Sequence, residues 1–279
     1  MPISRRTLVA AVLAIPFAAR AADNPLAALE RKYRGRLGVT ILDTATGRTL
    51  SHRANERFAL CSTFKLLAAA CVLKRVDDGR ETLDRQIAIT KDKVIAYSPA
   101  VAQHLDGTMT LAALCEAAVT LSDNGAANLI LEALGGPKAV TALARGLGDK
   151  VTRLDRTEPA LNDVPPGDVR DTTAPAAMAR TVQALTLGHA LSDASRRQLC
   201  DWLIACKTGD KRLRAGLPGG WRVGDKTGTG PRGIANDVAV VWPPGRAPLV
   251  VAGYYQGGGN AKGHRDAVLA EVGRIAAAF

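Results

Sequence analysis

Residues 58–70 read FALCSTFKLLAAA, and the rest of the chain is organised around this stretch. Apolar and small residues flank Ser62 and Lys65 on both sides, which predicts the start of a buried helix. A spacing of three residues places the two polar side chains on one helical face. A serine hydroxyl becomes a nucleophile when a neighbouring base takes its proton, and a desolvated lysine can be that base. Taken alone, the pair is more typical of a helix N-terminus with a serine cap.

Strand signals lie at both ends of the chain, and helix signals lie between them. Period-two alternation and β-branched residues predict strands, whereas apolar residues three and four positions apart predict helices. The economical architecture is one antiparallel sheet flanked by terminal helices, with an inserted all-helical domain; this is an α/β fold of the α+β type. The predicted strands span residues 37–43, 49–53, 235–242 and 248–255, with further strand character after 222, and the predicted helices span 25–33, 62–77, 111–120, 124–134, 137–146, 174–187, 193–206 and 261–279.

Residues 1–22 are predicted to be a signal peptide. Arg5 and Arg6 precede a short apolar run, and residues 19–21 read ARA, the pattern of a cleavage site. The run is too short to anchor the protein in a bilayer, so we expect a mature protein in the periplasm with no membrane attachment. The paired arginines resemble a twin-arginine export signal, but ordinary signals also carry two arginines.

Two domains are expected once the signal is removed. A sheet domain would combine residues 23–57 with residues 213–279, and the all-helical domain would comprise residues 58–212. A mature chain of this length can bury a sizeable core in one large domain or two interleaved ones.

Charge and composition argue against several classes of partner. The formal charge is +11, and the three arginines of residues 1–22 leave +8 on the mature chain. No basic block with interleaved aromatic residues predicts a nucleic-acid groove, so we expect the positive charge to form a basic surface, with some of the cations meeting an anionic substrate. The four histidines are scattered without HExxH or CxxC spacing, so we expect no metal and no cofactor. The five cysteines leave at least one thiol unpaired within the chain.

A second polar cluster, LSDNG at residues 121–125, follows one apolar helix and begins another. It is typical of a turn with a helix cap. Its place between two helices of the insert also allows Ser122 and Asn124 to direct a hydroxyl and an amide into a cleft.

A third cluster, RVGDKTGTG at residues 222–230, leads into the C-terminal strands. On a strand, Thr227 and Thr229 point to the same side, and Gly228 lets another group approach the backbone closely. Lys226 adds a charge. A second K-T-G, at residues 207–209, follows a helix, and we interpret it as a helix terminus.

Residues 153–171 carry little regular pattern, and compact loops of this length are often functional. Glu158 and Asn162 could together hold a water, while Arg156 and Asp171 form a plausible pair closing the loop. Pro159 makes a cis Glu158–Pro159 bond feasible. The alternative is a solvated surface loop.

Together, these motifs resemble one family. S-x-x-K at 62, S-D-N at 122 and K-T-G at 226 occur in order, with E-x-x-L-N at 158 between the last two. This set is the signature of class A serine β-lactamases and penicillin-binding proteins, and the chain resembles a class A β-lactamase over its whole mature length.

The resemblance implies hydrolysis of penicillins and cephalosporins through an acyl-enzyme, and hence antibiotic resistance, by a monomer without cofactor. Ser62 would attack the β-lactam carbonyl, with Lys65 or a water held by Glu158 as its base. Glu158 and Asn162 would then activate the water that releases the product. Ser122, held by Lys226, would protonate the leaving nitrogen, and the backbone N–H groups of Ser62 and Thr229 would form the oxyanion hole. The substrate itself would contact Tyr97 at the cleft wall, Asn124 at its side-chain amide, and Arg212, Thr227, Gly228 and Thr229 near its carboxylate.

The cysteines depart from patterns within that family. In the carbapenem-hydrolysing branch, a cysteine at the position of Cys61 pairs with one at the position that Gly230 occupies here, which speaks against carbapenem hydrolysis. Cys71 lies about one turn from the position that pairs with Cys115 in another branch, so we expect no bridge there.

Three rival functions share the same motifs. A penicillin-binding D,D-peptidase lacks the deacylating carboxylate, so Glu158 and Asn162 argue against it. A β-lactam sensor domain is normally tethered to a membrane segment, which we do not expect in this chain. A degenerate site that only binds cell-wall peptide would have lost catalytic residues, and all of them are present.

Overall fold

The structure is a computed structural model that describes residues 24–257 and 262–279. The predicted signal peptide, residues 1–22, lies outside the described residues. None of the helices that the structure describes combines the length and the apolar composition needed to cross a membrane.

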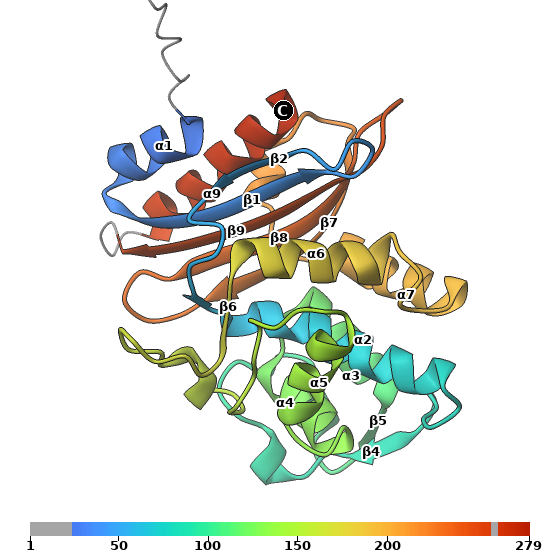
Figure 1. Ribbon diagram of the computed structural model, residues 1–279. Coiled ribbons are helices and arrows are strands. Elements are labelled where there is room, and N and C mark those ends of the chain that lie inside the picture. Colours follow the sequence, from blue (N-terminus) through green and yellow to red (C-terminus); the bar gives the residue numbers. More distant parts are fainter. Residues whose placement is uncertain (1–23, 258–261) are drawn as a thin grey trace, which may run out of the picture.

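Strands from both ends of the chain form one antiparallel sheet, as the sequence predicts (Figure 1). The strand order is β2-β1-β9-β8-β7, so the two ends of the chain meet where β1 pairs with β9. The register brings Leu37 opposite Tyr255 and Ile41 opposite Val251. The strands are β1 (Gly35–Asp43), β2 (Thr49–His52), β7 (Arg222–Thr229), β8 (Ala235–Trp242) and β9 (Leu249–Gly257).

Both faces of this sheet are buried, because successive side chains of a strand point to opposite faces. In β9, Val251 and Tyr255 pack towards α1 (Pro25–Tyr33) and α9 (Lys262–Ala278). The alternate residues Val250 and Tyr254 belong to the larger core shared with the helices on the other face. Of these, α6 (Pro175–Thr186) contacts β1 and β9.

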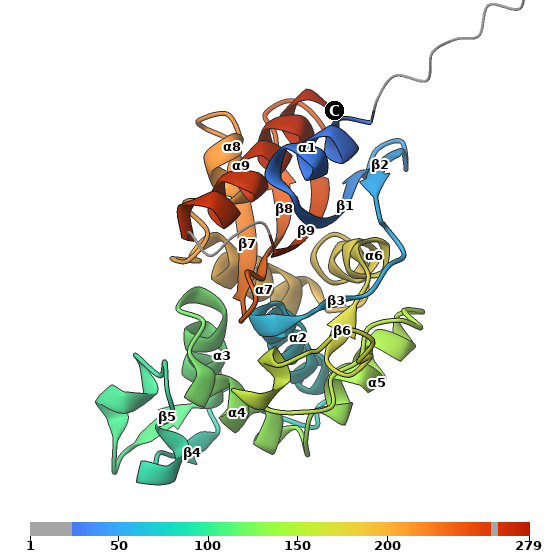
Figure 2. The ribbon, with the colours of Figure 1, turned by 90° about the vertical axis from the view of Figure 1, so that its left-hand side faces the viewer.

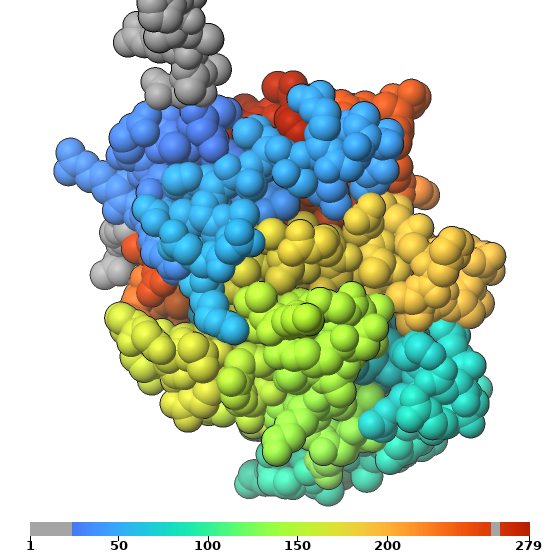
Figure 3. All heavy atoms as spheres, viewed as in Figure 1, coloured from blue at the N-terminus to red at the C-terminus, as the bar shows by residue number. Residues whose placement is uncertain are grey.

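The remaining helices gather around α2 (Phe64–Asp77), whose residues 64–73 are all buried. In the space-filling view, the yellow band of α6 and α7 lies between the sheet above and the green and cyan helices below (Figure 3). The further helices are α3 (Leu111–Thr120), α4 (Asn124–Ala133), α5 (Lys138–Gly146), α7 (Asp193–Ile204) and the short α8 (Leu213–Gly216), which packs on α9.

Several short elements were not predicted from the sequence. β3 (Phe58–Ala59) pairs with β6 (Thr172–Thr173), and β4 (Gln86–Ala88) pairs with β5 (Thr108–Thr110). The first of these pairs ties the segment before Ser62 to the end of the 153–171 loop. Single 3₁₀ turns occur at Cys61–Thr63, Lys91–Lys93, Val101–His104 and Ala160–Asn162.

All five cysteines are free in this structure, including Cys71 and Cys115. The boundaries of the two expected domains, 23–57 with 213–279 and 58–212, stay a prediction. The larger hydrophobic core runs continuously from the helices to the sheet residues Val250 and Tyr254.

Candidate active site

Ser62 lies in the 3₁₀ turn Cys61–Thr63, immediately before α2, and this correction shifts the predicted start of the α-helix from 62 to Phe64. Figure 2 shows this end of α2 between β7, α3 and the loop that leads into β6. Cys61 has a left-handed backbone, with φ of 42°, at the bend where β3 turns into α2. Ser62, the candidate nucleophile, therefore lies in a tight turn between β3 and α2 rather than in the helix itself.

Lys65 is completely buried one turn further along α2. Its Nζ donates to the Ser122 carbonyl at 2.8 Å and to Asn124 Oδ1 at 2.6 Å, and lies 3.1 Å from Glu158 Oε1. Burial lowers the pKa of Lys65, and the Glu158 carboxylate opposes that shift. The amine thus links its own segment to the LSDNG cluster and to the 153–171 loop.

The LSDNG cluster is both a helix cap and part of the cleft, because Asp123 caps the helix while Ser122 and Asn124 line the cavity. Asp123 caps α4, since its Oδ1 accepts from the Ala126 N–H at 2.8 Å. Ser122 has a left-handed φ of 61°, which turns it away from the helix. Its hydroxyl accepts from Lys226 Nζ at 3.0 Å, and Lys65 Nζ lies 3.5 Å away.

Lys226 is fully buried on β7, and burial lowers its pKa to about 8. The second lysine, Lys65, also disfavours its charged form. Two ammonium groups therefore converge on one serine hydroxyl with little solvent to screen them.

Glu158 reaches the nucleophile from the 153–171 loop. Ser62 Oγ donates to its Oε1 at 3.3 Å, and Asn162 Nδ2 donates to its Oε2 at 2.5 Å. Asn128 of α4 clamps the backbone of Glu158, because it accepts from the N–H and donates to the carbonyl, both at 2.9 Å. The Glu158–Pro159 bond is cis, as the sequence allowed.

The base of this loop is held by the predicted pair, with Arg156 Nε 2.6 Å from Asp171 Oδ2. Asp171 is buried and also accepts from the backbone N–H of Asp155 and of Arg156. The loop is consequently an ordered part of the site and not the solvated surface loop that was the alternative.

β7 forms the opposite wall, close to the turn that carries Ser62. A Cβ on Gly228 would lie 3.0 Å from the Leu60 carbonyl oxygen, so a glycine lets the strand approach that turn. Arg212 is buried behind the strand and donates to Gly228 O at 2.8 Å and to Thr229 Oγ1 at 2.7 Å. Asp266 of α9 holds the arginine at 2.9 Å.

These walls enclose a cavity of about 600 Å³. Tyr97 stands at its rim with 61% of the residue exposed and a left-handed φ of 62°. The other sequence-predicted residues that line it are Ser62, Ser122, Asn124, Asn162, Arg212, Thr227, Gly228 and Thr229, whereas Lys65, Glu158 and Lys226 are buried just beneath.

The second K-T-G is more than the helix terminus that the sequence suggested. Lys207 and Thr208 line the same cavity, together with Lys211. Thr208 Oγ1 lies 2.5 Å from Thr227 Oγ1, which brings the two K-T-G segments into direct contact. This pairing and the Asn128 clamp were both missed, because nothing within a few residues of either position indicates them.

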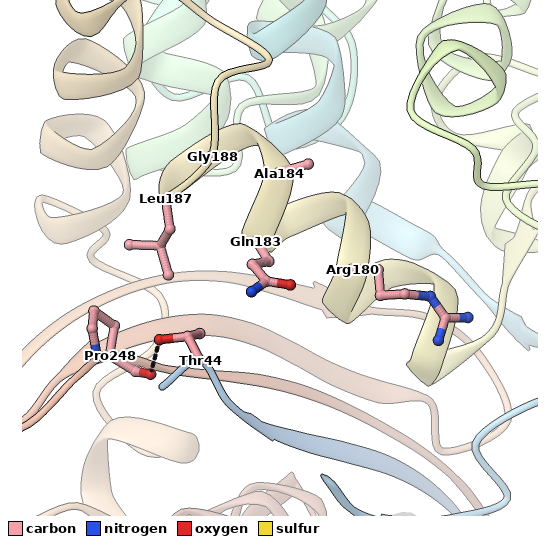
Figure 4. A pocket seen from close by; sticks show the side chains of 7 residues that line it. All are labelled: Thr44, Arg180, Gln183, Ala184, Leu187, Gly188 and Pro248. Atoms are coloured by element: carbon pink, nitrogen blue, oxygen red, sulfur yellow. Dashed lines mark hydrogen bonds between the residues drawn. The ribbon is translucent and has the colours of Figure 1, made fainter. Parts of the chain in front are cut away.

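A separate hollow of about 430 Å³ lies between α6 and the end of β1 (Figure 4). Its lining includes Thr44, whose hydroxyl donates to the Pro248 carbonyl at 2.7 Å, and Arg180, the one charged side chain. It contains no nucleophile beside a base, so the chemistry of the molecule belongs to the Ser62 cavity. Within residues 24–257 and 262–279, no group of three His, Cys, Asp or Glu side chains is arranged to hold a metal ion.

The arrangement suits acyl transfer. A hydroxyl lies beside a carboxylate, a second hydroxyl bridges two buried amines, and a threonine-lined strand backed by an arginine offers a place for an anion.

Comparison with known proteins agrees with this chemistry. The model of the beta-lactamase enzyme family matches residues 21–279. The chain is 50% identical to beta-lactamase CTX-M-8 of Citrobacter amalonaticus, over 93% of this chain and 90% of that protein. It is 48% identical to beta-lactamase L2 of Stenotrophomonas maltophilia, over 96% and 94%. Among solved structures, an ancestral class A beta-lactamase (GNCA) is similar with a TM-score of 0.90 and 62% identity, over 91% of this chain and 98% of that one. The chain therefore belongs to the class A β-lactamases, with their hydrolase activity and their mixed α/β fold.

Proposed function

We propose that the protein hydrolyses penicillins and cephalosporins through an acyl-enzyme on Ser62. The observation that carries this proposal is the contact of Ser62 Oγ with Glu158 Oε1 at 3.3 Å, in a site where Asn162 also holds the same carboxylate. A penicillin-binding enzyme needs only acylation of its serine, whereas this carboxylate would also serve deacylation by water.

In acylation, Ser62 Oγ bonds to the lactam carbonyl carbon while its proton leaves towards Glu158. The contact between these two groups favours Glu158 over Lys65, whose Nζ is occupied by Ser122 O and Asn124 Oδ1. The backbone N–H groups of Ser62 and Thr229 would stabilise the oxyanion. Lys65 contributes its charge, which is worth more in a buried site than in water.

The ring opens when the carbonyl carbon–nitrogen bond breaks and the nitrogen takes a proton from Ser122. The Ser122 hydroxyl is positioned for this by Lys226 Nζ at 3.0 Å, and Lys65 Nζ lies on its other side. Both cations favour release of that proton, and Ser122 recovers one from Lys65 Nζ at 3.5 Å. Lys65 takes in turn the proton that Glu158 accepted from Ser62, at 3.1 Å, so Glu158 is a carboxylate again before deacylation.

In deacylation, a water attacks the ester carbon and gives one proton to the Glu158 carboxylate, and Glu158 passes that proton to Ser62 Oγ as the ester carbon–oxygen bond breaks. Asn162 supports this step, because its Oδ1 is buried with no hydrogen-bond partner among the described residues. An acceptor beside the Glu158 carboxylate can hold the second hydrogen of the water and aim its oxygen at the ester.

The substrate carboxylate is proposed to lie at β7. Thr227 and Thr229 offer hydroxyls there, and Arg212 adds a fixed positive charge through Thr229. Tyr97 would cover one side of the β-lactam, and Asn124 Nδ2 already donates to the Ala96 carbonyl, so its amide is held at the rim for the substrate's side-chain amide. Gly228 allows the close approach that this placement needs.

The purified mature enzyme, mixed with nitrocefin and then with benzylpenicillin, tests the proposal when turnover and intact mass are measured together. We expect multiple turnover with no lasting adduct. Glu158→Ala should acylate more slowly, with Lys65 as the remaining base, and should then hold a stable adduct on Ser62 with the mass of benzylpenicillin added, because no carboxylate activates the water that deacylation needs. Unchanged turnover by Glu158→Ala would remove the carboxylate from the mechanism.

We also propose that the protein is exported to the periplasm, acts there as a monomer, and confers resistance to β-lactam antibiotics. The paired arginines and the ARA pattern at 19–21 support export. Expression of the full chain in a susceptible Gram-negative strain should raise the ampicillin concentration needed to stop growth. The same chain with Ser62→Ala should not.

A further inference from the structure

Three side chains connect the interior of the molecule to the carboxylate end of the cleft. Cys206 Sγ lies 3.3 Å from Thr208 Oγ1, and Thr208 Oγ1 lies 2.5 Å from Thr227 Oγ1. Cys206 is buried, whereas Thr208 and Thr227 both line the cavity. The mechanism uses Thr227 to meet the substrate carboxylate but leaves the two residues behind it without a role.

The direction of these hydrogen bonds decides what Thr227 can offer. A hydroxyl has one proton to donate and lone pairs with which to accept. If Thr227 donates to Thr208, only lone pairs face the cleft, and these repel a carboxylate. If Thr208 donates to Thr227 instead, the Thr227 proton is free for the substrate.

The substrate requires the second direction. A carboxylate only accepts hydrogen bonds, so a β-lactam carboxylate bound at β7 takes the Thr227 proton, and the Thr227 oxygen then accepts from the Thr208 hydroxyl at 2.5 Å. Hydrogen bonds aligned in one direction also polarise one another, which strengthens the last donor of the chain.

We propose that Thr208 is a positioning residue for substrate recognition: its hydroxyl donates to Thr227 and directs the Thr227 proton to the carboxylate of the β-lactam. This inference rests on the proposed function of the site. Recognition should depend on the Thr208 hydroxyl for β-lactams with a free carboxylate, but not for an ester of the same β-lactam.

The test compares benzylpenicillin with its methyl ester as substrates of the wild-type enzyme, Thr208→Val and Thr208→Ser. Valine has nearly the shape of threonine without the hydroxyl, and serine keeps the hydroxyl. Thr208→Val should lower kcat/KM for the acid about 10-fold, mainly through KM, because a hydrogen bond to a charged group is weakened. The ester should change less than about twofold, and Thr208→Ser should restore the acid to near the wild-type value.

The possible results separate this inference from the function beneath it. An acid-to-ester ratio in Thr208→Val equal to that of the wild type overturns the inference. An equal loss on acid and ester also overturns it, since that pattern reports general damage to the site. If the wild type and Thr208→Val prefer the acid over the ester to the same degree, the inference about Thr208 fails but the proposed function stands. A wild-type enzyme inactive on both acid and nitrocefin refutes the proposed function and the inference together.

Discussion

Asn162 and Glu158 share a hydrogen bond in which Asn162 Nδ2 donates to Glu158 Oε2 at 2.5 Å. The amide oxygen of the same asparagine is buried and has no partner among the described residues. An unpaired buried acceptor is costly, so this oxygen is poised for an outside donor. We therefore propose that the pair binds one water beside the Ser62 hydroxyl.

Asn162→Ala should slow deacylation without a comparable effect on acylation. We expect kcat for benzylpenicillin to fall about 100-fold, the range typical of losing the control of a general base. Rapid-quench mass spectrometry should then show acyl-enzyme during turnover. Asn55→Ala, at an exposed asparagine outside the cleft, is the matched control and should behave as wild type. A variant that loses acylation as strongly as deacylation would contradict the role of Asn162.

Activity should fall on the alkaline side near pH 8. Burial lowers the pKa of Lys226 to about 8, so its ammonium loses its charge as the pH rises through that value. Above it, the Ser122 hydroxyl and the substrate carboxylate lose a nearby cation, and kcat/KM should decrease. Lys226→Arg keeps a charge at every accessible pH and should remove this limb from the profile. If the limb persists in Lys226→Arg, another group produces it.

Arg212→Ala should raise KM for penicillins and cephalosporins by about 10-fold or more, the usual worth of a charged hydrogen bond. The guanidinium contacts Thr229 Oγ1 and Gly228 O, so its removal takes both the charge and the support of the strand. Asp266→Asn is the graded comparison, because it removes one ion-pair partner but leaves those two contacts. Equal KM values in the wild type and Arg212→Ala would place the carboxylate elsewhere.

Asp237 should make the protein less stable as the pH rises. Burial, together with the nearby Asp225 carboxyl, raises the pKa of Asp237 well above its usual range, and its Oδ1 has no partner among the described residues. The folded state then holds a proton that the unfolded state releases above pH 4, so stability falls with pH, by at most about 1.4 kcal/mol for each unit. Asp237→Asn removes this dependence.

Urea unfolding of both proteins at pH 5 and pH 8 measures the effect. The difference in unfolding free energy between Asp237→Asn and the wild type should shift in favour of the variant at pH 8. A difference that is the same at both pH values would show that Asp237 has the same charge in the folded and unfolded states.

Local patterns in the sequence were sufficient to predict the strands of the main sheet, most of the helices and the four motifs. The apolar, β-rich run in 249–257 and the apolar residues of 64–77 are patterns within one element, so they can be recognised without knowing the neighbours. The pairing of Arg156 with Asp171 could also be anticipated, since the two residues close a single loop. The family resemblance then indicated which of the motifs would meet.

Tertiary structure alone decided the contacts between motifs. Asn128 clamps Glu158 from another helix, Thr208 reaches Thr227 from the segment after α7, and the short pair β3–β6 joins residues more than a hundred positions apart. Asn128 and Thr208 look locally like ordinary polar residues of a helix or turn. Their roles depend on which surfaces the shared core brings together, and a buried core optimises packing over the whole chain at once rather than over any short window.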